Sequence, residues 1–180
     1  SSINSLSGIS SFTNIKYLDC SINQLSSLDV SNLSNLNELE CRNNQIVDLN
    51  INNLINLKSI VCAGNKLTNL NLSSLANLEG IYCSYNLIAS MNLNGLTKLQ
   101  YIDCAGNNFT QLEIKDLPKL QNLFCADNKQ LQSLQLSNLP VLGNLYCHLC
   151  SQLIELSMTN LPKLSNLDCF NCSIQTLNLS

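Results

Sequence analysis

Residues 57–77 have the sequence LKSIVCAGNKLTNLNLSSLAN, which follows the pattern L-x-x-I-x-C-x-x-N-x-L-x-x-L-x-L-x-x-L-x-x. A second unit with this pattern starts at Leu78, and an earlier one starts at Leu36. Self-similarity at a period of about 20 to 25 residues is typical of a solenoid, in which each unit stacks on its neighbours. This stretch therefore predicts the architecture of the whole chain.

One cysteine in each unit sets the register of the repeat. Successive cysteines are 21 residues apart for the first five steps and 22 apart for the last two, with the extra residue after Asn128. The aligned residues are Cys20, Cys41, Cys62, Cys83, Cys104, Cys125, Cys147 and Cys169. Eight coils are accordingly expected to begin at Ile15, Leu36, Leu57, Leu78, Leu99, Leu120, Leu142 and Leu164.

Each coil contains two short alternating segments. Residues 59–62 alternate so that Ile60 and Cys62 would point inward, which predicts a short strand. One such strand per coil predicts a parallel sheet with strands about 4.8 Å apart. Residues 69–72 alternate in the same way and predict a second strand or extended arc on the opposite side, because the segment is short and its Asn and Ser content disfavours a helix. A turn is expected at the shared column of Pro118, Pro140 and Pro162.

The two ends of the chain lack obvious caps. Residues 1–14 are expected to form a degenerate lead-in coil, in which Ile9 and Phe12 fit the end of a coil and Leu6 is out of register. Phe12 and Phe109 are expected at inward positions. Residues 15–180 are expected to form one domain. Because a solenoid needs capping units with a polar outer face, we expect the chain to be part of a longer protein or to pack its ends on another molecule.

Composition excludes several classes of function. The chain is 45% hydrophobic but only 12% charged, and its net charge is −3 with no basic stripe. Sequence-independent nucleic-acid binding requires such a stripe to neutralise phosphates, so no nucleic-acid partner is expected. No apolar run approaches the roughly 20 residues of a membrane span, and residues 1–12 have no charged segment typical of a signal peptide.

The repeat resembles the leucine-rich repeat, L-x-x-L-x-L-x-x-N/C-x-L, with Cys in place of the third Leu. The resemblance covers residues 15–180, and its short unit looks most like the internalin-like repeats of secreted and surface bacterial proteins. It implies a curved, mostly β solenoid with the parallel sheet on its concave face, short strands or turns on the convex side and no long helix. It further implies a binding function, no enzymatic activity and an extracellular or cell-surface location. Its N/C column is Asn23, Asn44, Asn65, Asn86, Asn107, Asn128, Cys150 and Cys172.

Four cysteines near the C-terminal end have the spacing of a zinc site. Cys147 and Cys150 are followed by Cys169 and Cys172 in a second C-x-x-C pair. The repeat places all four at inward positions without a metal, so zinc is the weaker interpretation. A Cys150–Cys172 disulfide is a further alternative, although side chains in a parallel ladder point the same way and would strain the bond. We favour free thiols that act as small buried hydrophobes, with no metal and no cofactor.

The outward positions of the first strand are the part of the coil that does not repeat. Aromatic residues concentrated there beside acids predict a recognition surface, because aromatic rings combine apolar area with a polar handle. The candidate binding residues are Tyr17, Asp19, Glu38, Glu40, Arg42, Tyr82, Tyr85, Tyr101, Asp103, Phe124, Tyr146, His148, Asp168 and Phe170. The alternative is that the rings only pair across strands for stability.

Small residues lie beside these aromatics and predict a shallow concavity. It would surround Tyr82, Tyr85, Tyr101 and Phe124. The residues expected to leave this space open are Ala63, Gly64, Gly80, Ala105, Gly106 and Ala126.

Three functions are compatible with such a surface. A protein-binding module is favoured, with a partner that carries basic and apolar groups. Carbohydrate binding is an alternative, because aromatic faces stack on sugars, and a structural spacer in a larger surface assembly is another. An enzyme is not expected, because the only histidine, His148, has no adjacent usable nucleophile and no glycine-rich phosphate loop is present.

Overall fold

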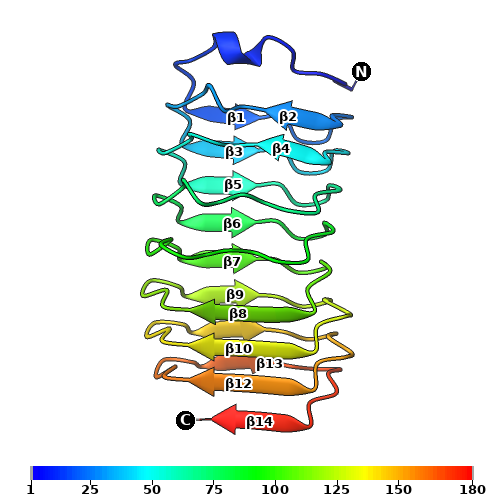
Figure 1. Ribbon diagram of the computed structural model, residues 1–180, viewed down its shortest axis with the longest axis vertical. Helices are drawn as coiled ribbons and strands as arrows, with labels where there is room; N and C mark the ends of the chain where they lie inside the picture. The colour runs from blue at the N-terminus through cyan, green and yellow to red at the C-terminus, as the bar shows by residue number, and fades with distance from the viewer. Residues whose placement is uncertain (1, 180) are drawn as a thin grey trace.

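The computed structural model describes residues 2–179, which form one continuous stack of coils (Figure 1). Ser1 and Ser180, at the outer ends of the two expected ranges, lie outside the described residues. An eight-stranded parallel sheet runs along the stack, as predicted, and equivalent residues of successive coils pair, as Ile60 does with Ile81. Its strands are β1 (Tyr17–Asp19), β3 (Glu38–Glu40), β5 (Ser59–Val61), β6 (Gly80–Tyr82), β7 (Tyr101–Asp103), β9 (Asn122–Phe124), β11 (Asn144–Tyr146) and β13 (Asn166–Asp168).

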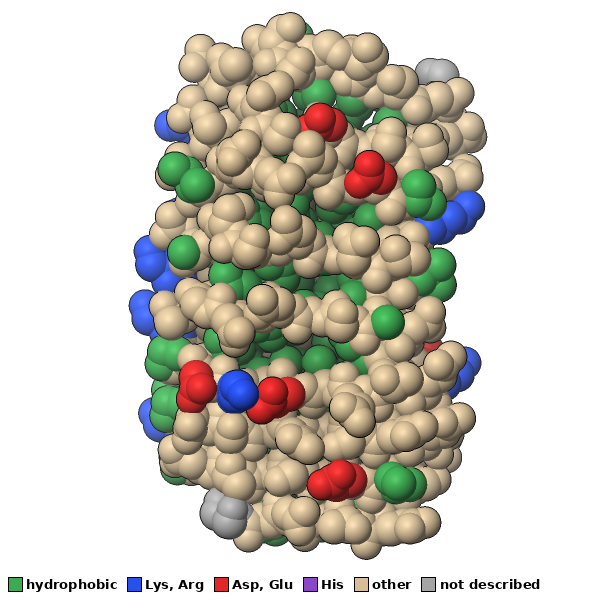
Figure 2. Space-filling view, in the orientation of Figure 1, with side chains coloured by type: hydrophobic (Ala, Val, Ile, Leu, Met, Phe, Trp, Pro, Cys, Tyr) green, Lys and Arg blue, Asp and Glu red, His purple; other side chains and the backbone are tan. Residues whose placement is uncertain are grey.

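The opposite side of the stack also carries strands, but not in every coil. β2 (Ser27–Asp29) pairs with β4 (Asp48–Asn50). The next two coils have no strand on this side, and the last four form a second parallel sheet. Its strands are β8 (Gln111–Lys115), β10 (Ser133–Ser137), β12 (Glu155–Thr159) and β14 (Thr176–Leu179). This side carries few charged side chains (Figure 2).

Helical structure is minimal, as the Asn and Ser content predicts. The described residues contain one helix, the 3₁₀ turn η1 (Ile9–Ser11). None of their helices is long and apolar enough to cross a membrane. The turn predicted at the proline column is present at Pro118, Pro140 and Pro162.

The core consists of inward side chains at equivalent positions of successive coils, which form columns along the length of the stack. Ile60, Cys62 and their equivalents in the central coils are fully buried between the two sides. All ten cysteines are free thiols, and only Cys169 and Cys172 are partly exposed. Burial raises the pKa of the Cys83 thiol to about 12, so the central thiols stay protonated and apolar near neutral pH. The cysteine column therefore packs as part of the hydrophobic core.

The asparagine column bonds each coil to the one before it. Asn86 donates from Nδ2 to the carbonyls of Cys62 and Cys83, at 3.0 and 3.1 Å. Its Oδ1 accepts from the N–H of Leu67 at 3.0 Å. One buried amide thus satisfies three backbone groups that have no strand partner.

Cysteine takes the place of asparagine in the last two coils and keeps one of these bonds. The Cys150 thiol donates to the Cys125 carbonyl at 3.4 Å, and the Cys172 thiol donates to the Cys147 carbonyl at 3.1 Å. This geometry explains the C-x-x-C spacing by the repeat itself. Among residues 2–179, no group of three or more His, Cys, Asp and Glu side chains is placed to hold a metal ion.

One expectation about the ends of the core is corrected. Phe12 was expected to point inward, but its side chain is 61% exposed, whereas Phe109 is fully buried as expected. The η1 turn directs Leu6 and Ile9 onto the core instead, although Leu6 is out of register with the repeat. In the last coil, Leu177 is half-exposed because no following coil covers it among the described residues.

Candidate functional site

Four aromatic rings form a continuous stack on the outer face of the eight-stranded sheet. We call Tyr82, Tyr101, Phe124 and Tyr146 the aromatic stack. Its successive ring centroids are 4.7, 5.1 and 4.7 Å apart, with interplanar angles of 25°, 26° and 9°. These distances fall in the range of favourable aromatic pairs. The structure therefore joins residues of four different coils into one apolar surface.

The stack crosses between two columns of the sheet. Tyr101 pairs in register with Gly80, whereas Tyr82 pairs with Asp103 and Asp103 pairs with Phe124. Tyr101 therefore has to lean across its own strand to lie between the other rings. Asp103 leaves room for it, because its carboxylate bonds on the other side to the Ser84 hydroxyl at 3.0 Å.

Gly80 allows the matching tilt of Tyr82. A Cβ at position 80 would lie 2.9 Å from Cε2 of the Tyr82 ring, which is closer than Cβ atoms pack. A residue with a side chain here would displace Tyr82. The stack thus depends on two short neighbours, Gly80 and Asp103.

Stacking determines which parts of the rings remain available. The inner ring faces cover one another, so the edges and the two terminal faces are what a ligand can contact. All four side chains are half-buried. Burial raises the pKa of the hydroxyls of Tyr82 and Tyr101, so both remain neutral hydrogen-bonding groups. The stack offers a rigid apolar ridge with polar tips.

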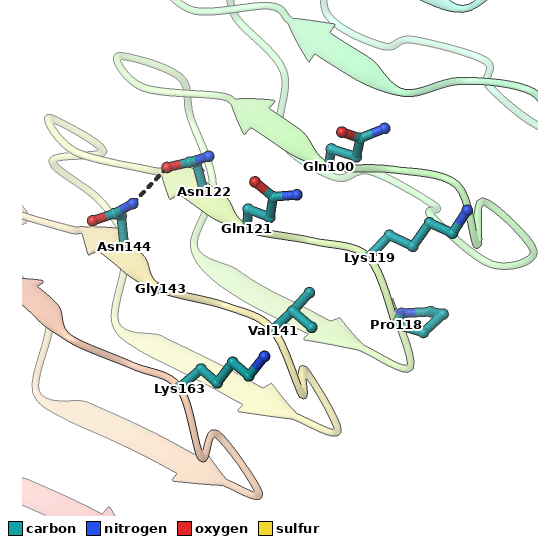
Figure 3. Close-up of a pocket in the computed structure, with 9 residues that line it drawn as sticks. All are labelled: Gln100, Pro118, Lys119, Gln121, Asn122, Val141, Gly143, Asn144 and Lys163. Atoms are coloured by element: carbon teal, nitrogen blue, oxygen red, sulfur yellow. Dashed lines mark hydrogen bonds between the residues drawn. The ribbon is translucent and has the colours of Figure 1, made fainter.

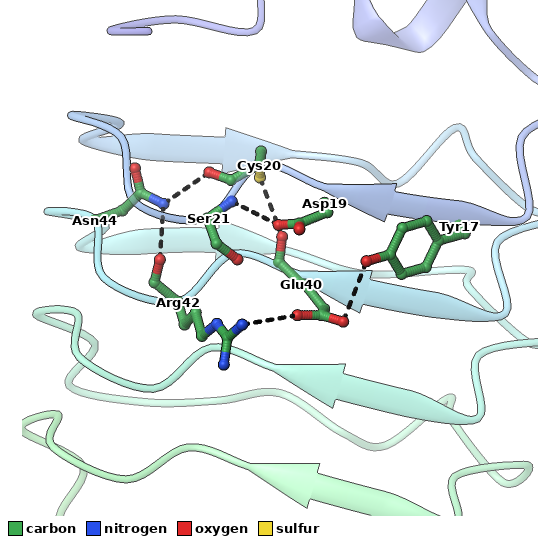
Figure 4. Close-up of polar contacts among 7 residues, drawn as sticks. All are labelled: Tyr17, Asp19, Cys20, Ser21, Glu40, Arg42 and Asn44. Carbon is green, nitrogen blue, oxygen red and sulfur yellow. Dashed lines mark hydrogen bonds and ion pairs between the residues drawn. The ribbon is translucent and has the colours of Figure 1, made fainter. Parts of the chain in front are cut away.

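An acidic group lies at the N-terminal end of the same face (Figure 4). Tyr17 donates from its hydroxyl to Glu40 Oε1 at 3.2 Å, and Arg42 Nη2 is 3.8 Å from Glu40 Oε2. Asp19 accepts from the N–H of Ser21 at 2.9 Å, and this bond lowers the pKa of the Asp19 carboxyl. Arg42 compensates one carboxylate, so the group retains an excess of negative charge together with the exposed Glu38.

A third group lies at the C-terminal end. His148 Nδ1 is 3.0 Å from Asp168 Oδ2, but the two atoms are not aligned for a hydrogen bond, so the contact is an ion pair when His148 is protonated. Phe170 is 74% exposed beside them. The neighbouring thiol of Cys147 is buried, which raises its pKa and leaves it unreactive.

Tyr85 lies beside the aromatic stack and not within it. It falls in the turn after β6 with a left-handed backbone, at φ 54°, and its ring is in none of the three stacked pairs. Its ring covers Gly106, where a Cβ would be 2.6 Å from Tyr85 Cδ1. Gly106 therefore leaves no open space, contrary to expectation, and Ala126 is also buried.

A hollow does lie beside Tyr82 and Tyr101, on the side of Gly80. It has a volume of about 450 Å³ and is lined by Glu38, Lys58, Ser59, Glu79, Gly80, Tyr82, Gln100 and Tyr101. This hollow lies at two of the four residues around which the sequence predicts a concavity, Tyr82 and Tyr101. Glu79, Lys58 and Gln100 come from the residues just before the strands, outside the columns whose aromatic and acidic residues indicate the site in the sequence.

A larger hollow of about 600 Å³ lies further along this flank (Figure 3). Gly143 and the short Val141 interrupt a row of longer polar side chains there, and Asn144 donates to Asn122 at 2.7 Å. The interruption is the signal from which this hollow was predictable. Its lining residues are Gln100, Pro118, Lys119, Gln121, Asn122, Val141, Gly143, Asn144 and Lys163.

The turn that follows each strand of the large sheet has a left-handed residue. We call this set the edge column; each member follows the cysteine column by two residues, and φ lies between 53° and 67°. It borders the face that carries the aromatic stack. Its members are Ile22, Asn43, Gly64, Tyr85, Gly106, Asp127, Leu149 and Asn171.

Comparisons with known proteins agree on the fold. No protein-family model and no curated protein sequence matches the chain. Among solved structures, the functional domain of InlJ from Listeria monocytogenes, described as including a cysteine ladder, matches with a TM-score of 0.70 and 23% identity over 99% of this chain. The internalin InlF of the same species matches with a TM-score of 0.63 and 18% identity over all of this chain and 71% of its own.

A third match comes from another genus. The Leptospira interrogans leucine-rich-repeat protein LIC12759 has a TM-score of 0.54 and 21% identity over 92% of this chain and 57% of its own. The chain spans 47% of the InlJ structure. The repeat pattern, the coil geometry and these similarities together show that the chain folds as an internalin-like leucine-rich-repeat solenoid.

Proposed function

We propose that this chain is a non-catalytic module that binds a protein partner on the outer face of its eight-stranded sheet. The observation that carries the proposal is the aromatic stack, which crosses four coils between the acidic N-terminal group and the His148–Asp168 pair. The internalin-like fold supports an interaction module in general.

The chemistry of the face favours a partner with apolar and basic side chains. Tyrosine loses little conformational freedom on binding and is enriched at interface hot spots. The stack holds its rings fixed before a partner arrives, which reduces the entropy lost on association. Asp19, Glu38 and Asp168 would pair with basic groups at the rim and steer the approach.

Carbohydrate binding is less compatible with this geometry. A sugar ring stacks on a free aromatic face, but the inner faces of the stack lie against neighbouring rings at 4.7 to 5.1 Å. Only the outer faces of Tyr82 and Tyr146 are left for that contact. Glycan binding is therefore an outcome that the experiment must be able to detect.

Placement outside the cell is part of the same proposal. The two internalins with similar folds favour a secreted or surface-exposed bacterial protein. The face needs no cofactor to act as proposed, because ring edges, hydroxyls and carboxylates make its contacts directly.

Site-specific photocrosslinking tests this function. A photoreactive phenylalanine replaces Tyr101 in one variant and Gln135, on the opposite sheet, in a matched control. After exposure to extracellular extract of the source organism, we expect a protein adduct from position 101 and none from position 135. Equal adducts or none would favour the spacer, and glycan-array signals lost in a Tyr82→Ala/Tyr146→Ala variant would favour carbohydrate.

A further inference from the structure

Two columns of this solenoid adopt the same left-handed backbone but differ in the residues they use. On the side opposite the aromatic stack, the left-handed positions are Asn53, Gly95, Asp116, Asn138 and Asn160, with φ between 55° and 82°. All are Asn, Asp or Gly, the residue types that tolerate this conformation. The edge column breaks the rule at Ile22, Tyr85 and Leu149.

The three exceptions carry two separate disadvantages. A bulky side chain is disfavoured at positive φ, and a β-branched one such as Ile22 most of all. Each is also exposed to solvent, by 73% at Ile22, 63% at Tyr85 and 39% at Leu149. Packing of the side chain against the core therefore does not explain why isoleucine is present at position 22. It explains the residues at positions 85 and 149 only in part.

The surrounding coils hold the strained backbone in place. The N–H of Ile22 donates to Arg42 O at 2.9 Å, that of Tyr85 to Ala105 O at 2.8 Å, and that of Leu149 to Phe170 O at 2.8 Å. Strain that a scaffold imposes on unsuitable residues is found at functional positions. In this solenoid, bulky residues with a left-handed backbone occur in the edge column, which borders the aromatic stack, and not in the opposite column.

Each exception also has a carboxylate of the face beside it. The residue before Ile22, Ser21, bonds to Asp19 at 2.9 Å. The one before Tyr85, Ser84, bonds to Asp103 at 3.0 Å. The one before Leu149, His148, lies 3.0 Å from Asp168. An apolar side chain next to an acid thus recurs three times along the edge, in the first, fourth and seventh coils.

We infer that Ile22, Tyr85 and Leu149 are contact residues for the protein partner of the aromatic face, and that this partner presents apolar side chains next to basic ones. The inference rests on the proposed function and extends its surface over the edge of the sheet. Charge complementarity selects the basic groups, because Asp19, Asp103 and Asp168 lie beside the three contacts. These three coils are about 14 Å apart at the spacing of stacked strands.

The test compares the effect of each substitution on the Tm with its effect on partner binding, because a binding residue and a packing residue respond differently. Ile22→Asn restores a residue suited to the backbone, so it should raise the Tm by about 2 to 4 °C while weakening partner binding. Tyr85→Asn and Leu149→Asn should weaken binding without lowering the Tm substantially. Asn138→Leu, on the opposite column, is the matched control and should lower the Tm while leaving binding unchanged.

The probe is a random peptide library displayed on phage and selected on the unmodified protein. We expect selected peptides to pair Arg or Lys with Leu, Ile or Phe, and each edge variant to bind the consensus peptide about tenfold more weakly. Edge variants that bind as the unmodified protein does, or an Ile22→Asn variant with a lower Tm, would overturn the inference.

The same peptide distinguishes this inference from the proposed function. If Tyr101→Ala abolishes peptide binding and the edge variants do not, the aromatic face stands and the edge contacts are wrong. If no peptide is selected, or if neither set of variants affects its binding, both proposals fail.

Discussion

The ring of Tyr82 lies against Gly80, two residues earlier in the same strand, with space for no Cβ between them. This contact tilts Tyr82 towards the column of Tyr101, and their ring centroids are 4.7 Å apart as a result. A glycine in a strand usually weakens it. Here the glycine is what allows four rings from four coils to meet.

Gly80→Ala is therefore expected to disrupt the stack while leaving the solenoid intact. The new Cβ would displace Tyr82 and separate it from Tyr101, so the near-ultraviolet circular dichroism of the coupled rings should fall. Gly143→Ala is the control, since its Cβ would have no neighbour closer than 3.9 Å. Identical near-ultraviolet spectra for the two variants would contradict the assigned role of Gly80.

The Asn column offers a test of the bonds between coils. Asn86→Ala removes three buried hydrogen bonds and should lower the free energy of unfolding by about 3 kcal/mol. Asn86→Cys should lower the free energy of unfolding by less, because Cys150 and Cys172 keep one such bond in the same column. Urea unfolding measures both variants.

Asn77→Ala provides the comparison for that series. Asn77 is a partly exposed asparagine whose Nδ2 donates to Ile55 O at 2.8 Å and whose Oδ1 accepts from Lys98 Nζ at 2.6 Å, both near solvent. Their loss should cost about 1 kcal/mol or less. Equal losses for the Ala and Cys variants at position 86 would show that the thiol does not replace the amide.

Stability should fall as the pH rises above about 8.5, the ordinary pKa of an unfolded thiol. Burial raises the pKa to about 11 at Cys20 and about 12 at Cys83. Below about pH 8.5 the thiols are protonated in both the folded and the unfolded state, so their burial contributes fully to the free energy of unfolding. Between the unfolded and folded pKa values only the unfolded state loses it, so each thiol lowers stability by about 1.4 kcal/mol per pH unit.

Urea unfolding at several alkaline pH values measures this slope. The Cys83→Ala variant should show a shallower decline than the unmodified protein, even though it starts from a lower stability. A decline of equal steepness in both would mean that other groups, such as the half-buried tyrosines, produce the effect.

The cysteines should also differ in their reactivity. A thiolate is the reactive species, so fully buried thiols with raised pKa values should react with a disulfide reagent only when the chain unfolds. Cys169 and Cys172 are partly exposed and should react first. Counting modified cysteines by mass spectrometry in native buffer tests this order; early modification of Cys62 or Cys104 would contradict it.

The sequence predicted the parts of the fold that depend on the repeat itself. Inward columns such as Ile60 and Cys62 follow from alternation, and the parallel register follows from the period. Phe12 was predicted wrongly because it lies outside the repeat, where a 3₁₀ turn rather than the coil directs the side chains.

The site was less predictable, because it depends on contacts between coils. The sequence placed aromatic residues on one face, but the lean of Tyr101 depends on the orientation of the Asp103 carboxylate and on Gly80. The left-handed backbone of Tyr85 was missed because Asn or Gly, the usual signals of that conformation, are absent there. Ile22 and Leu149 were missed for the same reason.

The bonds between coils repeat from one coil to the next: Asn86 bonds to Cys62 O as Asn65 does to Cys41 O. A whole coil inserted or deleted by in-frame duplication or loss of its gene segment would therefore find ready partners on both sides. The length of the solenoid can change by inheritance without new packing having to evolve. An insertion or deletion between the first and seventh coils would change a spacing among Ile22, Tyr85 and Leu149 by one coil, so a lineage could alter the spacing of the proposed contacts while keeping their chemistry.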